Sequence, residues 1–180
     1  MTSQRISRSE ALSLAQGKGE GGNLFELGRR AHQLRLERAE AGTVTYLVDR
    51  NINYTNACVT DCKFCAFYRP PGDPEAYVLD RETIAGKIRE TQEAGGTRIL
   101  LQGGHNPALR IAWYEDLLSW IKASFDIHLD AFSPSEISHL AGLEGRTVRD
   151  VLSRLKDAGM GGLPGGGAEI LHDEVRAEIS

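Results

Sequence analysis

The chain has 180 residues, enough for one ordinary domain, and its 41% apolar and 26% charged residues are typical of a globular protein. A formal net charge of -4 argues against a nucleic-acid partner, and no apolar run approaches the ~18 residues that a membrane span needs. The first residues also lack the apolar core of a signal peptide. We therefore expect a cytoplasmic protein without a nucleic-acid or membrane partner.

Two helices are predicted at the start of the chain. A short helical pattern around residues 10–16 is broken by glycines. Asn23 can cap a second helix, whose apolar residues recur at helical spacing to about Glu40. Gly42 ends this helix. We therefore predict an N-terminal helical extension over residues 1–42.

From residue 43 onward, strand and helix patterns alternate. Apolar and polar residues alternate over residues 44–48, as in a strand, and a second extended segment starts at Ile52 after a short turn. Further strands are predicted at residues 97–101, 126–132 and 160–163. Between and after these strands the pattern indicates four helices, which begin after Asp80, near Trp113, at Ser133 and at Thr147, and a final helix starts near His172.

This alternation implies an α/β fold with a parallel sheet and crossover helices. Each strand leads into a polar or glycine-rich loop, at residues 58–65, 102–104, 133–136 and 165–169. In parallel α/β folds the ligand lies at the carboxyl ends of the strands. We therefore expect these four loops to form one site.

About four barrel-type strands are present, whereas a closed (β/α) barrel commonly has eight strands in ~250 residues. We therefore interpret residues 43–180 as the first half of a TIM-type barrel, truncated from a longer protein. A complete half-barrel that dimerises is the alternative, but its open sheet edge would favour aggregation.

The most informative motif contains every cysteine of the chain, with the spacing Cys58-x3-Cys62-x2-Cys65. An iron–sulfur cluster usually takes four protein thiolates, so three suggest a cubane with one iron open to a small molecule. A zinc site is an alternative, although structural zinc needs four ligands and the nearest histidine candidates are His105 and His128. A redox pair, or three buried thiols without a role, would also fit the spacing.

With Phe64 before the last cysteine, the motif resembles the signature of radical S-adenosylmethionine (SAM) enzymes. The resemblance implies that Cys58, Cys62 and Cys65 hold a [4Fe-4S] cluster, that SAM chelates the fourth iron, and that Phe64 borders the adenine. It also implies reductive cleavage of the SAM C5′–S bond, hydrogen-atom abstraction from a small-molecule substrate, and a reductant protein such as flavodoxin or ferredoxin.

Longer stretches resemble the menaquinone (futalosine pathway) and deazaflavin-cofactor branch of this superfamily. They are residues 51–56, 65–69, 101–104, 133–137 and 163–170. The resemblance implies cyclisation of a futalosine-type nucleoside derivative, which Tyr54, Tyr68 and Arg69 favour. The aminofutalosine-forming and deazaflavin-forming reactions of the branch are alternatives. A zinc-stabilised binding module without catalysis is the alternative of another class.

The remaining candidate site residues lie in the strand-end loops. The resemblance places Gln102, Gly103 and Gly104 where the superfamily binds the SAM amino group, although His105 follows instead of the usual glutamate. An ordinary strand-to-helix turn is the alternative, and glycines there let the backbone approach a ligand.

Ser133 and Glu136 carry both a structural and a functional interpretation. They form a helix-capping pattern, and the resemblance places them near the ribose and carboxylate of SAM. The last loop, with Gly165, Gly166, Gly167 and Glu169, is predicted to lie against SAM or substrate, with a flexible connector as the alternative. Asp130 stands where the resembling proteins carry a second histidine, which leaves an acid–base role at that position in doubt.

Overall fold

The computed structural model describes residues 5–18, 23–166 and 170–179. The chain divides into two compact units, Met1–Tyr46 and Leu47–Ser180. Among the described residues, no helix is both long and apolar enough to cross a membrane.

The first unit contains the two predicted helices, α1 (Arg8–Ala15) and α2 (Leu24–Leu36). The Asn23 side chain caps α2 by accepting a hydrogen bond from the Phe25 N–H at 2.9 Å. Helix α2 ends at Leu36, before the predicted Glu40. The assignment of residues 1–42 as a separate extension stays a prediction.

The second unit is built on a parallel sheet of three strands in the order β1-β2-β3. The strands are β1 (Asp49–Asn53), β2 (Arg98–Gln102) and β3 (His128–Ala131). Leu101 of β2 is in register with Ile52 on one side and Ala131 on the other. The predicted α/β class with a parallel sheet is confirmed.

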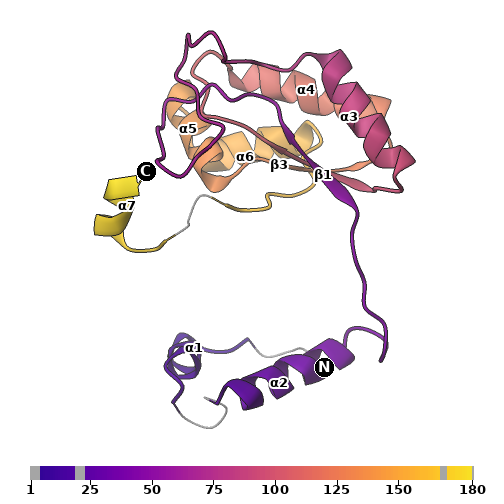
Figure 1. Ribbon diagram of the computed structural model, residues 1–180, viewed down its shortest axis with the longest axis vertical. Helices are drawn as coiled ribbons and strands as arrows, with labels where there is room; N and C mark the ends of the chain where they lie inside the picture. Colours follow the sequence, from indigo (N-terminus) through magenta and orange to yellow (C-terminus); the bar gives the residue numbers. More distant parts are fainter. Residues whose placement is uncertain (1–4, 19–22, 167–169, 180) are drawn as a thin grey trace. The chain divides into compact units, whose positions relative to one another are not determined.

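Helices follow the strands, as predicted. They are α3 (Arg81–Glu93) after β1, α4 (Ile111–Ser124) after β2, α5 (Pro134–Glu144) and α6 (Val148–Asp157) after β3, and α7 (Asp173–Ile179) at the end. Right-handed crossovers between neighbouring parallel strands place the helices on one side of the sheet, as α3 and α4 lie in Figure 1.

The core of this unit lies between that face and the helices. Ile99 and Leu101 of β2 are fully buried, whereas Arg98 and Gln102, which point to the other face, are only half-buried. The predicted helix caps are present: Asp80 accepts from the Thr83 N–H at 2.8 Å, and Thr147 accepts from the Asp150 N–H at 3.1 Å. Local signals and core packing therefore agree on where the helices begin.

Two predicted strands are wrong. Residues 44–48 form no strand, and Val44 and Tyr46 are 83% and 88% exposed, because pairing with β2 begins only at Asp49. At residues 160–163 the structure has one parallel bridge, between Gly162 and Asp130. Glycine weakens a strand because it adds no side chain to pack. The described residues therefore contain three strands rather than about four.

Candidate functional site

A cavity of about 530 Å³ lies at the carboxyl ends of the three strands. This is the volume range of ligand pockets, roughly 300–1,000 Å³. Its lining contains most of the residues that the sequence singled out, namely Cys58, Cys62, Phe64, Cys65, Gln102, Gly103, Gly104, Ser133, Glu136 and Gly166. Loops that are distant in the sequence thus meet at one place, as the topology predicts.

Three other predicted site residues are not in this group. Gly165 does not line the cavity, but its carbonyl oxygen accepts a hydrogen bond from Gln102 Nε2 at 3.3 Å. Gly167 and Glu169 lie outside the described residues. The roles assigned to all these residues stay predictions.

The lining also includes residues that sequence reasoning did not assign to the site. Thr55 and Asn56 lie beside the cysteine loop, and Thr60 lies within it, so proximity to the motif could have identified them. Arg176 comes from α7, more than a hundred residues from the cysteines, and no local pattern marks it. Arg69 forms an ion pair with Glu75 at 2.6 Å.

Backbone contacts join the two ends of the cysteine loop. The Cys58 N–H donates to the Arg69 carbonyl at 3.0 Å, and Ala57 and Arg69 form a parallel bridge. Cys58 Sγ accepts hydrogen bonds from the backbone N–H groups of Thr60 at 3.4 Å and His105 at 3.2 Å. Two backbone N–H groups thus point at the sulfur of the first predicted cluster ligand.

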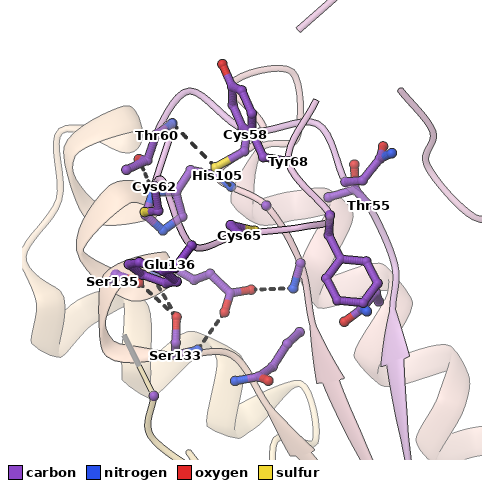
Figure 2. A pocket seen from close by; sticks show the side chains of 18 of the residues that line it. Thr55, Cys58, Thr60, Cys62, Cys65, Tyr68, His105, Ser133, Ser135 and Glu136 are labelled. Atoms are coloured by element: carbon purple, nitrogen blue, oxygen red, sulfur yellow. Dashed lines mark hydrogen bonds between the residues drawn. The ribbon is translucent and has the colours of Figure 1, made fainter. Parts of the chain in front are cut away.

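The three cysteines are thiols that lie around the cavity, with Glu136 and Ser133 nearby (Figure 2). Among the described residues, no three His, Cys, Asp or Glu side chains are grouped so that they could hold a single metal ion. A cubane is larger than one ion, so its ligands stand further apart. All three cysteines line one cavity, so the predicted cluster ligands come together at a single site.

Packing requires glycine at two neighbouring positions after β2. A Cβ on Gly103 would lie 2.5 Å from the Tyr54 ring. A Cβ on Gly104 would collide with the carbonyl oxygen of Ala57 and lie 2.9 Å from Cys58 Cβ. Both contacts are with fixed, packed groups, so neither can relax cheaply. The two glycines let the end of β2 pass directly beneath the cysteine loop.

Glu136 joins the ends of all three strands. Its Oε1 accepts hydrogen bonds from the Tyr54 hydroxyl at 2.8 Å and the Gly103 N–H at 3.0 Å. Its Oε2 accepts from the Ser133 N–H at 2.7 Å, which with the Ser133 side chain completes the predicted capping box. Glu136 is only 7% exposed, and this burial raises its pKa, while the hydrogen bonds act in the opposite direction.

Phe132 forms the turn between β3 and this cap. It is a buried, bulky residue with φ 68°, a left-handed conformation that costs of order ~1–3 kcal/mol. Its ring packs edge-to-face on Tyr114 at 5.4 Å and on Tyr54 at 6.3 Å. Aromatic packing thus holds the strained turn that directs the Ser133 N–H at Glu136.

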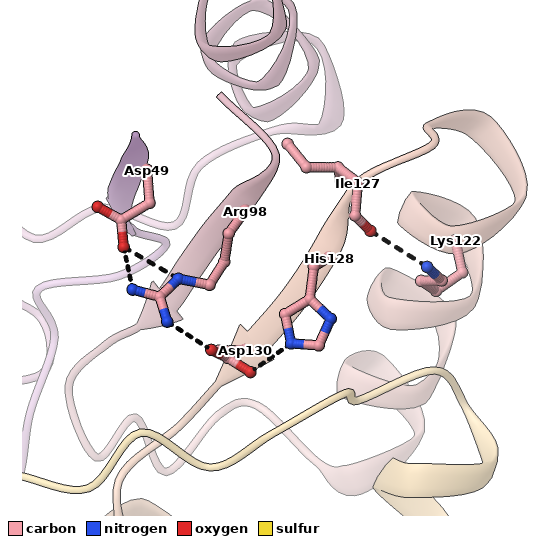
Figure 3. A network of polar contacts seen from close by, with 6 residues as sticks. All are labelled: Asp49, Arg98, Lys122, Ile127, His128 and Asp130. Carbon is pink, nitrogen blue, oxygen red and sulfur yellow. Dashed lines mark hydrogen bonds and ion pairs between the residues drawn. The ribbon is translucent and has the colours of Figure 1, made fainter. Parts of the chain in front are cut away.

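The face of the sheet to which Arg98 points carries a charged network (Figure 3). Arg98 contacts Asp49, with an Nε–Oδ2 distance of 3.0 Å, and Asp130, with an Nη1–Oδ2 distance of 3.3 Å. Asp130 Oδ1 is also 2.9 Å from His128 Nε2. Asp130, whose acid–base role the sequence left in doubt, therefore contacts the side chains of Arg98 and His128 on its own sheet.

Comparisons with known proteins agree with the site. Residues 52–180 match the Radical SAM superfamily. The chain is 45% identical over 178 residues to cyclic dehypoxanthine futalosine synthase of Halalkalibacterium halodurans, covering 98% of this chain and 47% of that protein. It is 40% identical over 175 residues to 5-amino-6-(D-ribitylamino)uracil–L-tyrosine 4-hydroxyphenyl transferase of Methanopyrus kandleri, covering 97% and 46%.

A third relative is FO synthase of Nocardia farcinica, which is 42% identical over 164 residues, or 91% of this chain and 19% of that protein. The chain thus spans about half the length of the first two relatives. The structure of methylornithine synthase matches with a TM-score of 0.53 at 14% identity, over 88% of this chain and 54% of that one, which shows a shared fold. The profile match over most of the chain means that this protein belongs to the radical SAM superfamily.

Proposed function

We propose that the protein catalyses the SAM-dependent cyclisation of dehypoxanthine futalosine to cyclic dehypoxanthine futalosine, in menaquinone biosynthesis. The observation that carries this proposal is the 45% identity to a cyclic dehypoxanthine futalosine synthase along 98% of the chain. The reaction removes one hydrogen atom, one electron and one proton from the substrate, so the product is lighter by two hydrogen atoms. SAM is the net oxidant: its conversion to methionine and 5′-deoxyadenosine takes up the hydrogen atom and, in net terms, the electron, and the proton is released to solvent.

Superfamily membership implies a [4Fe-4S] cluster and SAM as cofactors, as the cysteine motif predicts. When bound, they supply the 5′-deoxyadenosyl radical that takes the hydrogen atom. In our proposal Cys58, Cys62 and Cys65 hold the cluster, and the cavity beside them receives SAM, with Phe64 against the adenine.

The strand-end backbone limits how SAM is held. The Gly103 N–H donates to Glu136, and the Gly104 N–H donates to the Thr55 carbonyl at 3.0 Å. Both N–H groups are therefore used within the protein. The SAM ammonium can only donate hydrogen bonds, so this loop would meet it through carbonyl oxygens, which are suitable acceptors. Glu136 acts by fixing the loop.

A second reaction of the same branch is the main competitor. The chain is 40% identical to a tyrosine 4-hydroxyphenyl transferase and 42% identical to an FO synthase, values close to that for the cyclic synthase. An aminofutalosine-forming or deazaflavin-forming reaction would use the same cluster and SAM site. The substrate therefore decides between the candidates.

The test is an anaerobic assay of the protein reconstituted with iron and sulfide, with reduced flavodoxin or ferredoxin as the electron source. Dehypoxanthine futalosine is compared with 5-amino-6-(D-ribitylamino)uracil plus tyrosine, and products are identified by mass spectrometry. We expect 5′-deoxyadenosine and a product lighter by two hydrogen atoms from the first substrate alone. Turnover of only the second pair contradicts the cyclase proposal.

The same preparation tests the non-catalytic alternative. Stoichiometric zinc uptake, no cubane absorbance and no 5′-deoxyadenosine would replace the enzyme with a zinc-stabilised module. A Cys62→Ala variant serves as the matched negative control, because it removes one predicted cluster ligand.

A further inference from the structure

His105 makes three contacts with the cysteine loop. Its backbone N–H donates to Cys58 Sγ at 3.2 Å, and its carbonyl oxygen accepts from the Val59 N–H at 3.1 Å. Its ring Nδ1 shares a hydrogen bond of 2.9 Å with the Thr60 hydroxyl. His105, which follows the end of β2, thus contacts three consecutive residues of the loop that contains the predicted cluster ligands.

The other side of the His105 ring is also fixed. It stacks on His139 of α5, with ring centroids 5.0 Å apart and planes 9° from parallel. The ring is therefore held between the cysteine loop and α5 by a hydrogen bond on its edge and a stack on its face.

We propose that His105 is a positioning residue that sets the reduction potential of the cluster by holding its own backbone N–H on Cys58 Sγ. This inference rests on the cluster assignment of the proposed function. Hydrogen bonds to cluster sulfurs stabilise the more negatively charged, reduced state and so raise the potential. The Thr60 hydroxyl and the His139 ring keep the N–H at its short distance from the sulfur.

The decisive measurement is a redox titration of the reconstituted protein, followed by electron paramagnetic resonance without substrate. Thr60→Val removes the hydroxyl that holds the His105 ring, with little change of side-chain volume, and His105→Ala removes the ring. In both variants we expect one-electron reduction to become about tenfold less favourable, a shift of about 59 mV to more negative potential. The double variant should show no further shift, because the two groups act as a unit.

Two matched variants serve as controls. Thr60→Ser retains the hydroxyl and should restore the wild-type potential. Thr97→Val makes the same chemical change at an exposed position just before β2 begins, far along the strand from the cysteine loop, and should leave the potential unchanged. If Thr60→Val does not retain a cluster, the potential of His105→Ala decides by itself, and a wild-type value overturns the inference.

A wild-type potential in fully loaded Thr60→Val and His105→Ala proteins overturns the inference. This result is separate from the substrate proposal. Normal cyclised product with unchanged potentials would remove only the role of His105. Shifted potentials without cyclised product would remove only the assignment of the substrate.

Discussion

Replacing Tyr54 with phenylalanine removes a single oxygen atom from beneath the cavity. The Tyr54 hydroxyl donates to Glu136 at 2.8 Å, and both side chains are buried. The ring should stay in place, because it packs edge-to-face on Tyr114 at 5.7 Å and directly under Gly103. Tyr54→Phe therefore tests the hydrogen bond with little change in packing.

The expected cost follows from the partners of the carboxylate. A buried hydrogen bond to a charged group contributes about 1.5–3 kcal/mol. Glu136 keeps the Gly103 and Ser133 N–H donors in the variant, so its charge is not left without partners. We therefore expect the free energy of unfolding to fall by about 2 kcal/mol.

Urea denaturation followed by circular dichroism measures this loss as a lower midpoint with an unchanged slope. Tyr46→Phe is the matched control, because Tyr46 is 88% exposed and the same change there should cost less than about 0.5 kcal/mol. In a Glu136→Ala background, Tyr54→Phe should cost little, because its acceptor is gone. A loss as small as that of the control, or an equal loss in both backgrounds, would refute the joining role of Glu136.

Three further predictions concern the same site. Gly104→Ala places a methyl group against the Ala57 carbonyl, and we expect a loss of about 1–3 kcal/mol in stability with reduced iron content. Gly142→Ala, with open space around it, should show neither effect. Normal iron content in Gly104→Ala would argue against the close approach of β2 to the cysteine loop. Cys62→Ala should abolish the cubane absorbance and SAM cleavage, and a variant that still forms 5′-deoxyadenosine contradicts the ligand assignment. The folded-state pKa of Glu136 is raised, so its contribution to the free energy of unfolding is greatest below the unfolded value of 4.5 and is lost as pH rises through the folded value. Wild type should therefore gain stability relative to Glu136→Gln on acidification from neutral pH. A pH-independent difference in unfolding free energy between the two proteins would contradict this.

Short-range signals predicted the helices well. Asp80, Ser133 and Thr147 each have a side-chain oxygen that can cap a helix, and each accepts the expected backbone N–H. Strands were harder to predict, because pairing depends on a distant partner. The alternation around Tyr46 has the period of a strand, but pairing with β2 starts at Asp49. Gly162 makes only a bridge with Asp130, which a local apolar run could not reveal.

The cavity was predictable where chemistry and chain order coincide. The spacing of Cys58, Cys62 and Cys65 indicated the cofactor, and the alternating strands indicated that the loops would meet. Glu136 was recognisable as a capping residue, but its bonds to Tyr54 and Gly103 depend on three strand ends meeting in space. Neither spacing nor periodicity contains that information.

The most direct test of the central claim is the product formed from dehypoxanthine futalosine by the anaerobically reconstituted protein. We predict 5′-deoxyadenosine and a cyclised product lighter by two hydrogen atoms, both absent in Cys62→Ala. A protein that holds a cubane and cleaves SAM, but leaves dehypoxanthine futalosine unchanged while converting 5-amino-6-(D-ribitylamino)uracil and tyrosine, would contradict the claim.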